Sequence, residues 1–215
     1  MFKKFFTVAI TSVLLTASAA SAATLSLYGA NQTHGVTANN VLPGLNNSSI
    51  QMIDGQQKSA SNGLFLNVGS NAAEITYTFL GAEAGHSNVA VIAGDAEFFN
   101  RGRNSTLVGT QVKATQYVSG FLDFAFGTYR PSWARGLFNN DGAAHRDSAH
   151  HAMGFVPISA SAFYVLFDDI AWGDRDFDDM TMRVDVAAVP LPAGSLLLLS
   201  ALGGALLIRR RTKLA

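Results

Sequence analysis

Alternating hydrophobic and polar residues mark two long strands in the chain. In EITYTFL, residues 74–80, Ile75, Tyr77 and Phe79 alternate with threonines, and in MTMRVDV, residues 180–186, every second residue is hydrophobic. A period of two over six or more residues indicates a strand with one buried face. Both segments are therefore predicted to be half-buried strands.

Shorter apolar runs predict further strands. They are LFLNV at 64–68, NVAVIA at 88–93, FLDFAF at 121–126 and AFYVLF at 162–167. Glycine, asparagine and serine cluster between them, as in loops, and the polar residues 29–62 are predicted to be long loops with a little strand. Outside the two ends of the chain we find no convincing helical periodicity. The pattern predicts an all-β single domain, either a β-sandwich or a jelly roll.

The first 22 residues have the three-part pattern of a secretory signal peptide. Two lysines at 3 and 4 precede an apolar run from Phe5 to Leu15, and small residues stand at Ala20 and Ala22. A signal peptidase reads small residues at these two places, so we expect cleavage after Ala22. A buried N-terminal helix is the alternative, but it does not account for the three-part order.

The other end of the chain, residues 189–215, predicts a short transmembrane helix. The 18 residues from Leu191 to Ile208 carry no charge. As a helix they would span ~27 Å, just short of a hydrocarbon core of ~30 Å. Arg209, Arg210 and Arg211 follow, and basic residues that flank a span tend to stay in the cytoplasm. A core helix of a soluble domain is the alternative, although nothing on this segment is polar enough to face water.

A family resemblance covers this tail. The pentad Val189, Pro190, Leu191, Pro192 and Ala193, the apolar helix and the arginine cluster together resemble a PEP-CTERM sorting signal of the VPLPA variant. The resemblance implies that an exosortase-type membrane enzyme processes the chain near the pentad. The precursor would then be associated with the inner membrane, and the mature form would be at the cell surface or outside the cell. A plain membrane anchor is the alternative.

Composition limits the partners of the domain between the two signals, residues 23–188. This length suits one domain with a sizeable core. The domain holds nine basic and fifteen acidic residues, a net charge of −6, which disfavours nucleic acid and favours cations. The chain has no cysteine, so disulfides and thiolate metal sites are excluded.

Seven of the acidic residues lie within FDDIAWGDRDFDDMTMRVDV, residues 167–186. Asp174, Asp176 and Asp178 occupy alternate positions, from which a tight loop can direct several carboxylates at one Ca²⁺ ion, with help from Asp169 or Asp179. The segment is not an EF-hand loop, because no glycine follows the third aspartate and no glutamate stands at the twelfth position. A solvated acidic turn, with Arg175 and Arg183 as partial counter-charges, is an equally weighted alternative.

A second resemblance covers the same stretch, which is similar to the C-terminal signature of the DUF4114-like family of exported bacterial proteins. The matching residues are Phe167, Asp168, Asp169, Gly173, Asp174, Asp176, Phe177 and Asp179. Asp178 stands where that signature more often has asparagine. YTFLGAEAGHSN, residues 77–88, also resembles a stretch common in PEP-CTERM proteins. These resemblances imply a β-rich exported domain with an ion site and no reaction.

Three other groups are weaker candidates for a site. They are the loop with His145, Asp147, His150 and His151, the pair Glu83 and His86, and the two tryptophans Trp133 and Trp172. The first group has zinc-ligating side chains, the second could act as an acid–base pair, and the third could stack on sugars. No Gly-x-Ser-x-Gly, P-loop or His-Glu-x-x-His motif is present.

The sorting signal outweighs these candidates. We therefore expect a non-enzymatic, exosortase-sorted protein of the cell surface or extracellular matrix, stabilised by Ca²⁺. A carbohydrate-binding module in extracellular polysaccharide is the first alternative, and a secreted hydrolase is the second.

Overall fold

A computed structural model describes residues 22–30, 32–36, 38–54, 62–69, 72–103, 105–130, 133–141, 151–169 and 176–189, with the backbone alone at 129–130 and 133–136. This part of the chain is all-β, as predicted, apart from one 3₁₀ turn at Pro43–Leu45. The strands are β1 (Thr24–Tyr28), β2 (Gln32–Gly35), β3 (Ser49–Asp54), β4 (Gly63–Asn67), β5 (Ala73–Gly81), β6 (Ser87–Ile92), β7 (Ala96–Phe99), β8 (Gln111–Gln116), β9 (Gly120–Phe121), β10 (Phe124–Arg130), β11 (Trp133–Asn139), β12 (Ala152–Ser159), β13 (Ala162–Asp168) and β14 (Met180–Ala188).

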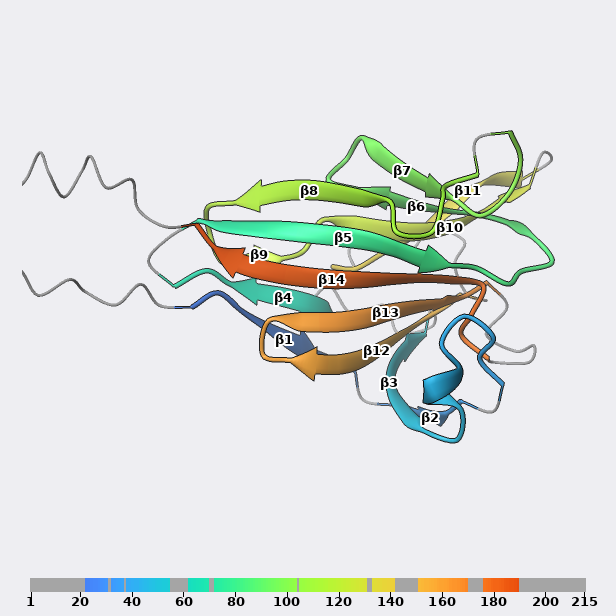
Figure 1. Cartoon of the computed structure of the whole chain (residues 1–215), viewed down its shortest axis with the longest axis horizontal. Coiled ribbons are helices and arrows are strands. Elements are labelled where there is room, and N and C mark those ends of the chain that lie inside the picture. Colours follow the sequence, from blue (N-terminus) through green and yellow to red (C-terminus); the bar gives the residue numbers. More distant parts are fainter. Residues whose placement is uncertain are drawn as a thin grey trace, which may run out of the picture.

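The strands form three antiparallel sheets (Figure 1). The largest has the order β2-β3-β12-β13-β14-β5-β8, the second β11-β10-β6-β7, and the third β1-β4-β9. In the described residues no helix is long and apolar enough to cross a membrane. The predicted signal peptide and transmembrane helix lie almost wholly outside these residues.

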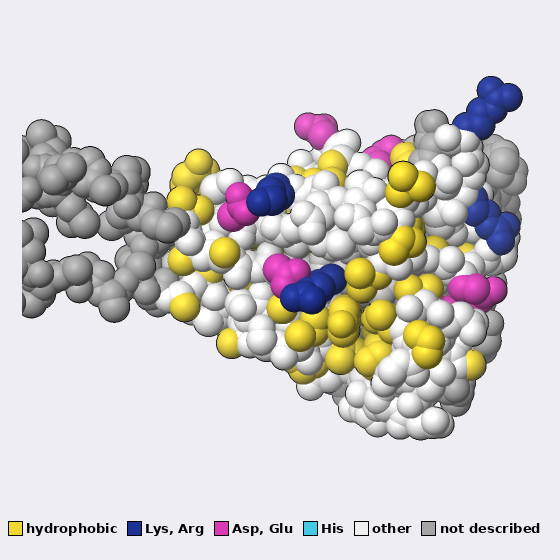
Figure 2. Space-filling view, viewed as in Figure 1, with side chains coloured by type: hydrophobic (Ala, Val, Ile, Leu, Met, Phe, Trp, Pro, Cys, Tyr) yellow, Lys and Arg dark blue, Asp and Glu magenta, His cyan; other side chains and the backbone are white. Residues whose placement is uncertain are grey.

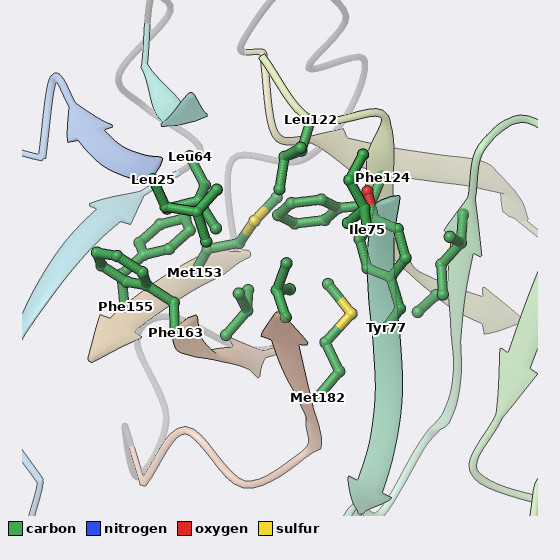
Figure 3. Close-up of a cluster of buried hydrophobic side chains, with 14 of the residues drawn as sticks. Leu25, Leu64, Ile75, Tyr77, Leu122, Phe124, Met153, Phe155, Phe163 and Met182 are labelled. Carbon is green, nitrogen blue, oxygen red and sulfur yellow. The ribbon is translucent and has the colours of Figure 1, made fainter. Parts of the chain in front are cut away.

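The main core forms between the seven-stranded sheet and the two smaller sheets. β5 buries every second residue from Ala73 to Phe79, and its partner β14 does the same, with Tyr77 opposite Val184. Rings from different sheets meet in this core, since Phe126 of β10 stacks on Phe167 of β13 at 4.9 Å. Figure 3 shows side chains from all three sheets converging. The two long alternating strands predicted from sequence are therefore confirmed.

A smaller core lies on the opposite face of β3, β12 and β13. Its buried members are Val36, Ile50, Met52, Ala152, Leu166 and Phe177. Leu42 and Leu45 pack against it, so the segment before β3 covers this face of the large sheet. Phe177 comes from the acidic stretch, which is thereby attached to the same cluster.

The face of the molecule in Figure 2 carries few charged side chains. Figure 2 shows basic and acidic side chains adjacent at two places on one face. Lys113 with Glu74, at 2.7 Å, and Arg183 with Asp185, at 2.6 Å, are ion pairs of this kind. Both pairs are substantially exposed, so each stabilises the fold by at most about 1 kcal/mol.

The strand pattern differs from the sequence prediction in several places. Residues 29–62 contain a little strand, as predicted, in β2 and β3, although β3 is an interior strand that pairs with β12. β1, β7, β8, β11 and β12 were not predicted. The apolar run at 121–126 is divided, because Asp123 is exposed between β9 and β10.

The first and last strands meet at one end of the molecule. The Leu25 N–H donates to the Ala160 carbonyl at 2.8 Å, and the Val186 N–H donates to the Ser161 carbonyl at 2.9 Å. The turn between β12 and β13 therefore lies beside both the start of β1 and the end of β14, on the left in Figure 1. β14 is nine residues long. It begins at the opposite end of the sheet and ends beside this turn, a distance of ~27 Å.

Candidate cation site

Three segments that are distant in sequence meet at the end of the large sheet where β5 ends and β14 begins (Figure 1). They are residues 38–46, residues 82–86 and the acidic residues that precede β14. The Glu83 N–H donates to the Asp178 carbonyl at 2.7 Å, and the Asn40 N–H donates to Asp178 Oδ2 at 2.6 Å. Asp178 therefore connects all three segments.

Phe177 holds the acidic segment in place. Its side chain is fully buried in the smaller core, and its ring centroid lies 5.5 Å from that of His34. Its backbone is left-handed, with φ of 59°, which costs a residue with a side chain ~1–3 kcal/mol. Ring burial, worth ~1.5–3 kcal/mol, offsets this cost. The flanking Asp176 and Asp178 are thus fixed by a ring that points into the protein.

Asn39 secures the same turn from the other side. Its side-chain amide is buried and donates to the carbonyls of Asp176 and Phe177, each at 3.1 Å. Its Oδ1 accepts from the Leu42 N–H, which shapes its own loop. The Asn39 amide therefore satisfies two backbone carbonyls of the acidic turn.

Carboxylate oxygens of Glu83, Asp176 and Asp178 lie within 4.8 Å of one another. Glu83 is exposed, whereas Asp178 is 0% exposed. Asp178 Oδ2 accepts from Asn40, but Asp178 Oδ1 is buried without a hydrogen-bond partner among the described residues. A buried carboxylate oxygen without a partner is costly, so this arrangement favours a bound cation.

A second acidic group lies next to the first. Asp179 Oδ2 accepts from the Asp169 N–H at 2.8 Å, and Asp169 in turn contacts Asn88 Nδ2 at 2.8 Å and His86 Nδ1 at 3.2 Å. Burial raises the pKa of Asp179 to about 8, as do the charges of Asp169, Asp168 and Asp176, while the Asp169 N–H opposes the shift. Asp176 is therefore close enough to influence both groups.

Of the predicted metal ligands, Asp176 and Asp178 come together, while Asp169 and Asp179 form the adjacent group; Asp174 lies outside the described residues. Metal binding by these residues stays a prediction. Glu83 was not predicted as a ligand, since it is 93 positions from Asp176 in the sequence and no local pattern connects them. Glu83 could have been found as a ligand only from the pairing of β5 with β14, because Glu83 follows the end of β5 where β14 begins.

Arg183 and Arg101 form hydrogen bonds to groups other than the carboxylates of the site. Arg183, suggested as a counter-charge for the turn, forms a fork with both carboxylate oxygens of Asp185, whose hydrogen bond raises the Arg183 pKa. Arg101 donates to the carbonyls of Ala84 and Gly85. The other suggested counter-charge, Arg175, lies outside the described residues.

Of the weaker candidates, two histidines have described surroundings. His151 is buried and its Nε2 lies 3.1 Å from Thr128 Oγ1. His86 contacts Asp169, while its suggested partner Glu83 belongs to the carboxylate cluster. The remaining candidates, His145, Asp147, His150, Trp172 and the side chain of Trp133, lie outside the description.

Most of the two predicted export signals also lies outside it. At their inner borders, Ala22 is exposed, and the Val189 N–H donates to the Ala72 carbonyl at 2.8 Å. Ala20, the rest of the pentad and the arginine cluster are not described.

Comparison with known proteins gives no relative. No protein-family model matches the chain, and neither the curated proteins nor the solved structures contain a significant match. Only the chain's own residues therefore indicate its function.

Proposed function

We propose that this chain is an exported, non-enzymatic protein that an exosortase-type enzyme sorts to the cell surface or the extracellular matrix, and that Ca²⁺ stabilises its β-sandwich. The signal-like residues 1–22 and the sorting-signal-like residues 189–215 motivate the export. The acidic end of the sandwich motivates the cation.

One structural observation supports surface display. The first and last strands meet beside the turn at residues 160–161, and the acidic end lies a full length of β14 away. A domain held by a segment that follows β14 would therefore present its acidic loops away from the membrane.

Mass spectrometry of the surface or secreted form tests this proposal. We expect an N-terminus at Ala23 and a C-terminus close to the pentad. Replacing the three arginines at 209–211 with uncharged residues should weaken membrane retention of the precursor, because the basic stop is lost. A mature chain that still ends in Lys213, Leu214 and Ala215 would contradict processing and leave a plain anchor.

A three-ring cluster favours carbohydrate binding as the second candidate function. Tyr28, Phe65 and Phe121 pack edge to face on the outer side of the three-stranded sheet, with centroids 5.3–6.2 Å apart, and Tyr28 is 49% exposed. A glycan array should then show binding that Tyr28→Ala abolishes. Tyr117→Ala is the matched control, because Tyr117 is also exposed.

A further inference from the structure

We infer that one Ca²⁺ ion binds to Glu83, Asp176 and Asp178 and joins the β5–β6 loop, the β13–β14 loop and the segment before β3. This inference rests on the proposed export, because Ca²⁺ outside cells can reach the concentrations that such a site needs. It deepens that proposal by naming the ligands and the ion.

The spacing of the three carboxylates suits Ca²⁺. Oxygens bound to one Ca²⁺ at ~2.3–2.6 Å lie at most ~5 Å apart, whereas oxygens bound to Mg²⁺ at ~2.1 Å lie at most ~4.2 Å apart. Ligand oxygens of Glu83, Asp176 and Asp178 lie within 4.8 Å of one another. One Ca²⁺ can therefore touch all three, and its flexible shell of six to eight oxygens suits carboxylates from separate segments better than the rigid octahedral, water-retaining shell of Mg²⁺ does.

The burial of Asp178 is the second, independent observation. Its side chain is 0% exposed, and Oδ1 lacks a hydrogen-bond partner although Oδ2 accepts from Asn40. Water does not reach this oxygen to solvate it, and a carboxylate oxygen of Asp178 lies within 4.8 Å of ligand oxygens of Glu83 and Asp176, which add negative charge nearby. A divalent cation would satisfy Oδ1 and cancel that repulsion.

The turn itself is built to hold these ligands at fixed positions. The buried ring of Phe177 lies between Asp176 and Asp178 in sequence, and the amide of Asn39 holds the carbonyls of residues 176 and 177. Glu83 is held through its own N–H, which donates to the Asp178 carbonyl. Binding of the ion therefore has to order few further groups, so the conformational entropy lost on binding is small.

The test compares thermal melting of the purified full chain in detergent with EDTA, with ~10 mM Ca²⁺ and with ~10 mM Mg²⁺. For a Kd of ~10⁻⁴–10⁻³ M, Ca²⁺ should raise the melting temperature by roughly 3–10 °C, and Mg²⁺ should raise it by much less. Glu83→Gln should remove most of the calcium response and, because Glu83 is exposed, should leave the fold intact. Asp95→Asn is the matched control, an exposed carboxylate in the β6–β7 turn that should keep the full response.

Asp178→Asn gives a sharper result. It should lose the calcium response and melt no lower than wild type in EDTA, because the repulsion among the carboxylates is reduced. An unmoved wild-type melting temperature, or an equal rise in wild type and Glu83→Gln, would overturn the inference. Export and C-terminal processing are measured separately from melting, so the sorting part of the proposed function can hold while ion binding fails, and the reverse.

Discussion

The anchoring of the acidic turn by Phe177 can be tested with two substitutions at one position. Phe177→Ala removes a ring that is 0% exposed and that packs against Ile50, Leu166 and their neighbours. Truncation of a buried phenylalanine costs ~3–5 kcal/mol, the sum of lost transfer energy and the cavity that remains. The free energy of unfolding in urea, measured on the full chain in EDTA, should fall by this amount.

Phe177→Gly removes the same ring but should be less harmful than Phe177→Ala. The backbone φ of 59° is left-handed, a conformation that costs alanine ~1–2 kcal/mol and costs glycine almost nothing. We therefore expect the smaller residue to give the more stable protein, by about 1 kcal/mol. Because both variants are measured without Ca²⁺, the comparison is independent of the ion.

Two outcomes would refute this reasoning. A loss below 1 kcal/mol in Phe177→Ala would mean that the ring does not anchor the turn. A glycine variant less stable than the alanine variant would mean that residue 177 is not left-handed in solution. Tyr117→Ala, at an exposed position, should change the free energy of unfolding by no more than ~0.5 kcal/mol and serves as the control.

Three further predictions concern stability, each measured by urea unfolding of the full chain. The buried amide of Asn140 bonds both the N–H and the carbonyl of Leu64, so Asn140→Ala should cost about 1–3 kcal/mol for each group left without a partner. Gly154→Ala should cost about 1–3 kcal/mol, because a Cβ there would lie 2.5 Å from Ile50 Cδ1. The pKa of Asp179 rises on folding from 3.8 to about 8, so the folded state binds its proton more tightly; in EDTA its contribution to stability should be greatest below about pH 4 and fall as pH rises to about 8. Asp179→Asn should flatten this slope, and an unchanged slope would assign it to other groups.

The parts of the fold that sequence predicts well are those whose burial follows a regular period. β5 alternates throughout and β14 alternates from Met182 to Val186, because one face of each packs on the main core. β3 and β12 bury residues on both faces of the sheet, with Met52 in the smaller core and Met153 in the main core, so their hydrophobic pattern is irregular. The second face of these strands is covered by Val36, Leu42, Leu45 and Phe177, which are distant from β12 in sequence, so no local pattern predicts it.

The candidate site shows the same limit. Asp176 and Asp178 could be predicted because they alternate within one short segment. Glu83 could not, because it reaches them only through the pairing of β5 with β14, which places Gly81 opposite Thr181. The burial of Asp178 could not be predicted either, because aspartates in a run are normally exposed to solvent.

The position of β14 in the sheet has a consequence for the timing of folding. β14 lies between β13 and β5, although it is the last strand in the described sequence. β5 has only the polar edge strand β8 on its other side, so the two halves of the sheet cannot join until residues 180–188 have been synthesised. Pairings over such separations form slowly, because the intervening chain must first close a large loop. In a nascent chain the seven-stranded sheet would thus stay in two parts until residues 180–188 have been synthesised.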